Sequence, residues 1–135
     1  MRPISVMQRT LLVVDDEPEI VRMVAKIFEA RGHRVVTGKD GQEALDLVAK
    51  ERPDLLLLDL DLPKLDGWEV CRRLKADPAL RGLPVVMMTA AHVSQEAAQR
   101  GIDAGADEYV QKPFLRDVLV HNVERLLGDG TTPRR

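Results

Sequence analysis

Short hydrophobic runs alternate along the chain with longer stretches in which hydrophobic residues recur at helical spacing. The short runs predict five strands, at residues 10–14, 34–37, 55–58, 85–88 and 109–111. The longer stretches predict five helices, at residues 18–31, 42–50, 68–74, 93–102 and 114–127. Pro18 suits the first turn of a helix, Asp66 suits a helix cap, and Gly32 and Gly128 suit helix ends.

Three of the predicted strands are hydrophobic at nearly every position. These are the strands at residues 10–14, 55–58 and 85–88. Continuous hydrophobic strands are typical of a parallel sheet that helices cover on both faces, whereas a half-exposed sheet would show alternation. The pattern therefore predicts an α/β fold, a doubly wound parallel sheet in a three-layer sandwich.

The composition indicates one globular domain. Of the 135 residues, 44% are hydrophobic and 31% are charged, which excludes disorder as the default state. The 20 Lys and Arg residues against 22 Asp and Glu residues give a net charge of −2, which argues against direct nucleic-acid binding. No hydrophobic run approaches the ~20 residues of a membrane span. The single cysteine, Cys71, fits a reducing compartment, so we expect a cytoplasmic protein without a membrane segment.

Polar residues follow the predicted strands at their carboxyl ends. Asp15 and Asp16 follow the first strand and Asp59 follows the third, while Thr89 and Lys112 follow the fourth and the fifth. The carboxyl ends of parallel strands share one edge of the sheet, and ligands of such folds bind there. We therefore expect these side chains to lie close together, although they span almost the whole sequence.

Carboxylates that share one cleft repel each other unless a proton or a cation offsets their charge. Mg²⁺ fits such a cleft because it prefers oxygen ligands and takes one or two carboxylates. A carboxylate beside the cation can act as a nucleophile toward phosphorus. Thr89 and Lys112 are then the available donors for the oxygens of a phosphoryl group.

Each of these residues also has an ordinary structural interpretation. Asp15 and Asp16 could be helix-capping carboxylates, Thr89 could simply end its strand, and Lys112 could be a solvated lysine. Asp59 is harder to explain in this way, because a carboxylate that ends a buried strand is costly without a partner.

The motifs together resemble a known family. They are Asp15-Asp16, residues 53–59, Leu62-Pro63, Asp66-Gly67, Thr89-Ala90, Gly105-Ala106-Asp107 and Lys112-Pro113. In this order and at these strand ends they resemble the receiver domain of two-component response regulators. The resemblance covers residues 9–128, with 1–8 as an N-terminal extension and 129–135 as a C-terminal tail or truncated linker. It implies a flavodoxin-like fold with strand order 2-1-3-4-5.

The resemblance implies that Asp59 accepts a phosphoryl group from a histidine kinase or a histidine phosphotransfer protein. It also implies a site for Mg²⁺ or Mn²⁺ formed by Asp15, Asp16, Asp59 and the backbone carbonyl of Asp61. The side chain of Asp61 should point toward the cleft and add negative charge there.

Further roles are implied by the same resemblance. Thr89 and Lys112 would contact the phosphoryl oxygens, Thr89 and Tyr109 would form the switch, and the bond before Pro113 would be cis. Phosphorylation would reshape the face formed by the fourth helix, the fifth strand and the fifth helix. That face would bind partners or a second copy of the chain, and an output domain could follow Arg135.

Two alternatives stay open. Residues 57–61 also resemble the nucleophile motif of haloacid dehalogenase-type phosphatases, although Leu62-Pro63 replaces the usual Thr or Val and the chain is short for a core and a cap. The second alternative is a receiver-like domain that signals only by protein contact. The complete set of acids, hydroxyl and lysine argues against it, and we expect no turnover of an external substrate.

Overall fold

The sheet has five parallel strands in the order β2-β1-β3-β4-β5. The structure is a computed structural model that describes residues 8–89, 99 and 103–128. The strands are β1 (Thr10–Val14), β2 (Arg34–Gly38), β3 (Leu55–Asp59), β4 (Val85–Thr89) and β5 (Glu108–Gln111). This confirms the predicted parallel sheet and its strand order.

Four helices lie within the described residues: α1 (Pro18–Glu29), α2 (Gly41–Glu51), α3 (Gly67–Ala76) and α5 (Arg116–Leu127). The helix predicted at residues 93–102, apart from residue 99, and the tail at 129–135 lie outside the described residues. The last helix begins two residues later than expected, because Leu115 has an extended backbone (φ −83°, ψ 137°) and serves as its N-cap. In the described part of the chain, no helix combines the length and the hydrophobicity that crossing a bilayer requires.

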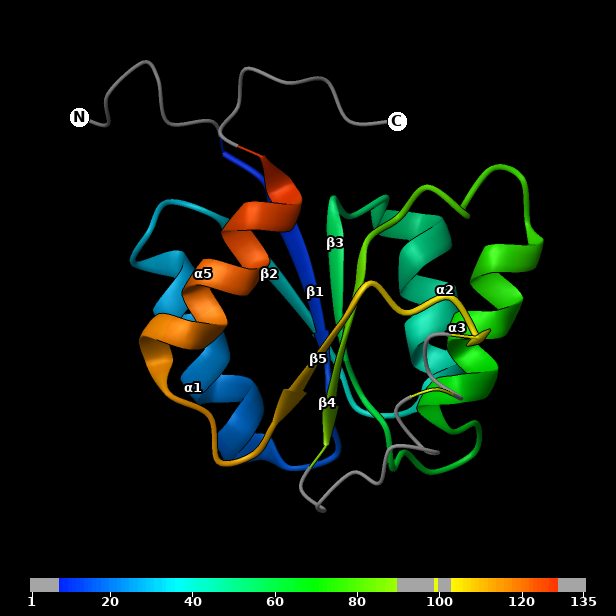
Figure 1. The fold of residues 1–135 in the computed structure, drawn as a ribbon, viewed down its shortest axis with the longest axis horizontal. Helices are drawn as coiled ribbons and strands as arrows, with labels where there is room; N and C mark the ends of the chain where they lie inside the picture. Colours follow the sequence, from blue (N-terminus) through cyan, green and yellow to red (C-terminus); the bar gives the residue numbers. More distant parts are fainter. Residues whose placement is uncertain (1–7, 90–98, 100–102, 129–135) are drawn as a thin grey trace.

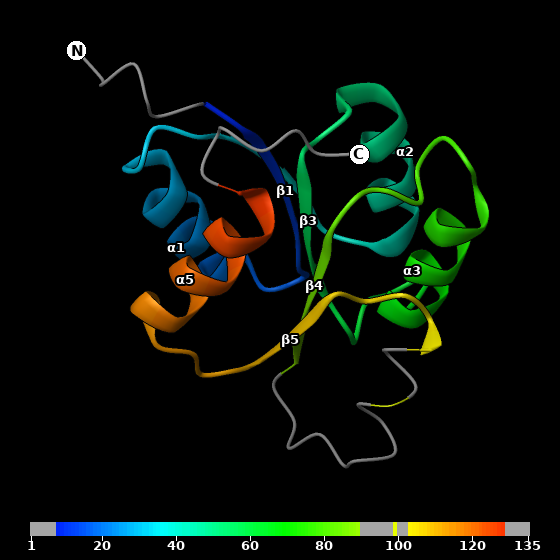
Figure 2. The same ribbon diagram turned by 45° about the horizontal axis from the view of Figure 1, so that its top comes forward.

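The helices cover both faces of the sheet, with α1 and α5 on one face and α2 and α3 on the other (Figures 1 and 2). Because successive strand residues point to opposite faces, each strand supplies two hydrophobic cores. Leu11, Leu57 and Val86 belong to the α1/α5 core. Leu12 and Leu58 belong to the α2/α3 core. This division explains the uninterrupted hydrophobic runs.

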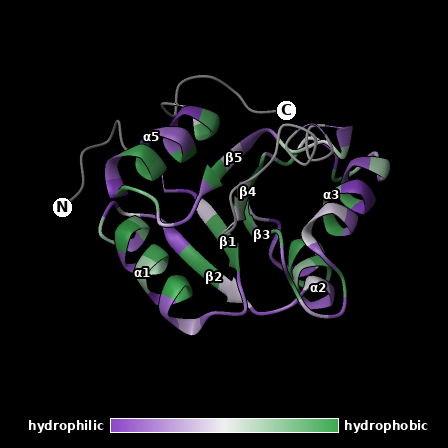
Figure 3. Cartoon of the chain, turned by 60° about the horizontal axis from the view of Figure 1, so that its bottom comes forward, coloured by the Kyte–Doolittle hydropathy of each residue, from purple (hydrophilic) through white to green (hydrophobic). Residues whose placement is uncertain are grey.

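Central and edge strands differ in exposure as this arrangement requires. Every residue of β3 and β4 is buried, whereas the edge strands β2 and β5 contain exposed positions. Hydrophobic and hydrophilic residues alternate along the helices, which turn their hydrophobic sides to the sheet (Figure 3). The three-layer sandwich thus follows from the hydrophobic pattern.

The connection between β3 and α3 is fixed by hydrogen bonds between its two ends, to the first turn of α3 and to the start of α2. The N–H of Gly67 donates to the carbonyl of Leu60 at 2.9 Å, and Asp66 caps α3 by accepting from the N–H of Glu69 at 2.9 Å. The N–H of Gly41, at the start of α2, donates to the carbonyl of Pro63 at 3.3 Å. This connection begins directly after Asp59, so its anchoring fixes the backbone at the end of β3.

A methyl group at position 41 would collide with this connection. A Cβ there would lie 2.1 Å from the carbonyl oxygen of Leu65, which is a backbone atom. We expect Gly41→Ala to destabilise the protein by roughly 1–3 kcal/mol, measured by urea unfolding. Gly38→Ala is the matched control, because a Cβ at that position meets only side-chain atoms, at 3.2–3.4 Å. Equal unfolding midpoints for the two variants would contradict the anchoring described here.

Candidate functional site

Three charged side chains from distant parts of the sequence meet at the carboxyl edge of the sheet. Asp15 follows β1, Asp59 ends β3, and Lys112 follows β5. Each stands two residues after a member of the α1/α5 core, namely Val13, Leu57 and Val110. Strand alternation therefore directs all three side chains to the same side of the sheet.

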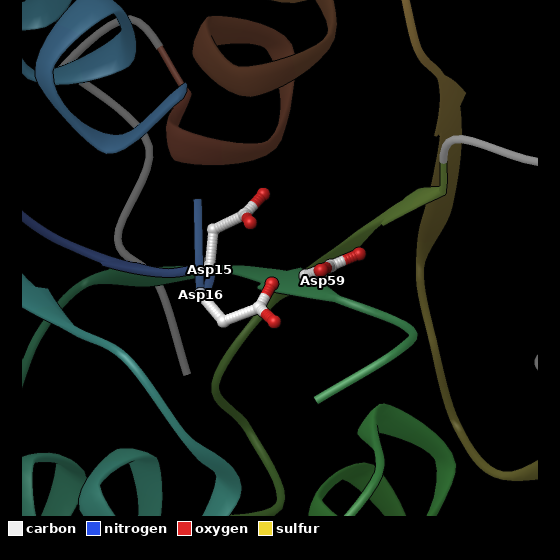
Figure 4. A group of neighbouring side chains, drawn as sticks. All are labelled: Asp15, Asp16 and Asp59. Carbon is white, nitrogen blue, oxygen red and sulfur yellow. The ribbon is translucent and has the colours of Figure 1, made fainter. Parts of the chain in front are cut away.

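Three carboxylates form a compact group at this edge. Asp15, Asp16 and Asp59 each offer an oxygen, and these oxygens lie within 4.8 Å of one another. Figure 4 shows them gathered where β1 and β3 end. Asp15 and Asp59 are buried, with 1% and 4% exposure, whereas Asp16 is exposed. The predicted convergence of these acids is thus present in the structure.

Lys112 supplies the positive charge of the site. Its Nζ lies 2.6 Å from Oδ2 of Asp15, 3.3 Å from Oε1 of Glu17 and 3.6 Å from Oδ1 of Asp59. Its backbone N–H donates to the carbonyl of Thr89 at 2.7 Å. With only 7% of its surface exposed, Lys112 is not an ordinary solvated lysine.

Glu17 is a member of the site that the sequence reasoning did not identify. Its side chain is 58% exposed and reaches Lys112 from the start of α1. Its position directly after Asp15 and Asp16 was the sequence signal that could have placed it in the site. The helix-capping interpretation of Asp15 is wrong, because the N-cap of α1 is Glu17 and Asp15 accepts from the N–H of Glu17 at 2.9 Å.

The environment changes the protonation of Asp59. Burial and the nearby charge of Asp15, opposed by Lys112 and by the backbone N–H of Asp61, raise the pKa of Asp59 to about 7. Burial lowers the pKa of Lys112, but the hydrogen bond that Lys112 donates to Asp15 and the charges of Asp59 and Asp15 outweigh it and raise that pKa overall. Near neutral pH the lysine is therefore charged, while Asp59 is divided between its two forms.

This donor set fits a hard divalent cation. All three clustered groups are carboxylates, and oxygen ligands are those that Mg²⁺ and Mn²⁺ prefer. Lys112 contributes one positive charge against Asp15, Asp16, Asp59 and the nearby Glu17, so negative charge remains in excess. Asp15, Asp16 and Asp59 could hold such an ion, which would compensate that excess.

Asp61 and the bond before Pro113 lie beside this group. Asp61 is exposed, and its side chain is not part of the three-carboxylate group, although we expected it to point toward the cleft. The peptide bond between Lys112 and Pro113 is cis, as the resemblance implies.

Tyr109 lies on the opposite side of the sheet from the Lys112 side chain, and Thr89 ends the neighbouring strand β4. Tyr109 is half-buried, packs against the α2/α3 core and pairs with Met87 of β4. Thr89 is buried, with 1% exposure, and stands two residues after Met87 of the α2/α3 core, so the two residues have the same parity along β4. The indole N–H of Trp68 donates to the hydroxyl of Tyr109 at 3.1 Å.

A family model described as the response regulator receiver domain matches residues 11–124. The response regulator MprA of Mycolicibacterium vanbaalenii is 42% identical over 124 residues, which are 91% of this chain and 52% of that protein. The chain thus spans about half the length of the curated relatives it matches.

Two solved structures share the fold at moderate identity. The signal receiver domain of a histidine kinase from Syntrophus aciditrophicus is 32% identical with a TM-score of 0.84, covering 93% of this chain and 95% of that one. A CheY-like response regulator receiver domain protein from Methanospirillum hungatei is 27% identical with a TM-score of 0.82, covering 90% and 94%.

The raised pKa of Asp59 predicts how stability depends on pH without divalent ions. An unfolded chain releases this proton near pH ~3.9, whereas the folded protein keeps it until about pH 7. The stability that this proton provides is full below the lower value and is lost as pH rises through the higher one. In EDTA we expect Asp59→Asn to melt about 5 °C or more above the unmodified protein at about pH 8, with a smaller difference at about pH 5.

The matched control for this experiment is Asp117→Asn, because that side chain is 94% exposed. It should leave the melting temperature close to that of the unmodified protein at both pH values. A melting temperature for Asp59→Asn that is equally displaced at both pH values would contradict the assigned protonation.

Proposed function

Because the chain belongs to the response regulator receiver domain family, we propose that it is a phosphorylation-controlled switch whose phosphoryl acceptor is Asp59. The donor would be a histidine kinase or a histidine phosphotransfer protein. The observation that carries the proposal is the group of Asp15, Asp16 and Lys112 around a buried aspartate at the carboxyl edge of the sheet.

The proposed reaction is a transfer of one phosphoryl group. An Asp59 carboxylate oxygen attacks phosphorus and forms an O–P bond, while the P–N bond of phosphohistidine breaks and its electron pair stays on the imidazole nitrogen. Lys112, now 3.6 Å from Asp59, would contact a phosphoryl oxygen, and Thr89 would donate a hydrogen bond to another. Mg²⁺ or Mn²⁺ at Asp15, Asp16, Asp59 and the carbonyl of Asp61 would supply compensating positive charge.

Phosphorylation would be read out through Thr89 and Tyr109. A phosphoryl group adds nearly two negative charges and three acceptor oxygens, which would attract the Thr89 hydroxyl. Thr89 stands two residues after Met87, the partner of Tyr109 on the neighbouring strand, so strand alternation directs both side chains alike. Movement of Thr89 would therefore open space for Tyr109. The change would be a shift between two populations, and would reshape the face to which β5 and α5 contribute. The predicted fourth helix of that face lies largely outside the described residues.

The proposed domain comprises residues 9–128. We infer that the reshaped face binds a partner, an output domain or a second copy of the chain, since the similar protein MprA is about twice as long as the region that this chain matches. Action in the cytoplasm agrees with the buried, unpaired thiol of Cys71.

The acceptor assignment predicts the outcome of phosphorylation with acetyl phosphate. With Mg²⁺ present, we expect the protein to gain one phosphoryl group by intact-mass measurement, and Asp59→Asn to gain none, because an amide is a poor nucleophile. Asp117→Asn, the exposed control, should be labelled like the unmodified protein. Labelling of Asp59→Asn at the unmodified level would refute the assignment.

The same protein preparation distinguishes the phosphatase alternative. A phosphatase of the haloacid dehalogenase type would turn over a generic phosphate ester many times per molecule. We expect no such turnover, because Leu62-Pro63 departs from that family's motif and the 135 residues are few for its usual core and cap. Sustained hydrolysis of p-nitrophenyl phosphate, lost in Asp59→Asn, would favour the enzyme instead.

Asp61 provides a separate test of the charge around the acceptor. Its side chain is exposed two residues after Asp59, so it adds negative charge near the site without joining the three-carboxylate group. We expect Asp61→Asn to weaken Mg²⁺ binding roughly twofold or more and to change the rate at which Asp59 loses its phosphoryl group. Equal Mg²⁺ affinity and equal hydrolysis rates in the two proteins would show that this charge has no role.

A further inference from the structure

Trp68 links the start of α3 to the edge strand β5. Its indole N–H donates to the hydroxyl of Tyr109 at 3.1 Å, across 41 positions of sequence. Both side chains are half-buried and pack against the α2/α3 core. A hydrogen bond between two aromatic side chains in a partly dry environment fixes the orientation of both rings.

The position of Trp68 is tied to the end of β3, where Asp59 lies. Gly67, its neighbour in the chain, donates from its N–H to the carbonyl of Leu60 at 2.9 Å. A Cβ on Gly67 would lie only 2.7 Å from the carbonyl oxygen of Asp59, so the backbones touch there. Asp66 caps the same helix turn. Trp68 therefore extends from a backbone segment that is fixed relative to the acceptor.

Tyr109, in contrast, lies on an edge strand. Among the described strands, β5 pairs with β4 alone, through residues 86–89 and 108–111, and it contains exposed positions. A tyrosine on such a strand has more freedom to turn than one in β3 or β4. The bond from Trp68 thus connects a fixed donor to a more adaptable acceptor.

We propose that Trp68 is a positioning residue that holds Tyr109 in its present orientation and thereby sets how easily phosphorylation of Asp59 turns the switch. The inference rests on the proposed function, because it takes Tyr109 as the residue that moves. Turning Tyr109 away breaks the hydrogen bond to Trp68, and this cost favours the resting population. Removal of either partner removes that cost and shifts the population toward the active form.

The test measures how tightly the protein binds beryllofluoride with Mg²⁺, a stable mimic of the aspartyl phosphate, by calorimetry. Trp68→Phe and Tyr109→Phe keep an aromatic ring and remove one partner of the bond. We expect each to bind beryllofluoride roughly two- to tenfold more tightly than the unmodified protein, the range that one hydrogen bond supports. The double variant should bind like either single variant, because the second change removes nothing further.

A packing role alone would give a different pattern. The two substitutions would then have independent effects that multiply in the double variant, or no effect on affinity, and either result would overturn the proposal. Far-ultraviolet circular dichroism and urea unfolding identify any variant that fails to fold. Tyr109→Phe provides the second route to the same measurement if Trp68→Phe is unstable.

Fluorescence gives an independent readout, because the chain contains one tryptophan and one tyrosine. The emission of Trp68 should change when beryllofluoride and Mg²⁺ bind, and this change should be smaller in Tyr109→Phe, where the bond is already absent. An equal change in both proteins would contradict the proposal. If the unmodified protein does not bind beryllofluoride at all, the proposed function fails; if it binds but the variants match it, only the role of Trp68 fails.

Discussion

Repulsion between carboxylates is the constraint on which the site depends. Asp15, Asp16 and Asp59 offer oxygens within 4.8 Å of one another, and two of the three side chains are buried. Burial, together with the charge of Asp15 that one lysine does not fully offset, raises the pKa of Asp59 to about 7. Such a group of carboxylates favours the binding of protons or cations, which offset its negative charge.

The order and direction of the strands bring these like charges together. In the order β2-β1-β3-β4-β5, the adjacent strands β1 and β3 end in acids, while Lys112 must reach across from the far edge. Strand alternation places Asp15, Asp59 and Lys112 on the α1/α5 side, and Tyr109 on the α2/α3 side. The sheet thus separates the charged group from Tyr109, and Thr89 ends the strand that lies between β3 and β5.

Much of this arrangement could be predicted from sequence, because strand ends and hydrophobic runs are local signals. The continuous runs specified a covered parallel sheet, and the acids after β1 and β3 specified the site. The contacts of Glu17 with Lys112 and of Trp68 with Tyr109 could not be predicted, since they depend on how far side chains reach between elements. Asp61 is exposed and lies outside the three-carboxylate group, so its expected direction toward the cleft stays a prediction.

The central claim is that distant acids form one cation site around the phosphoryl acceptor. A crystal of the protein soaked in Mn²⁺ tests it directly, because manganese gives an anomalous signal that locates the ion without reference to activity. The account predicts one strong peak with oxygen ligands from Asp15, Asp16 and Asp59. A bound ion elsewhere on the molecule, with no peak between these three side chains, would contradict it.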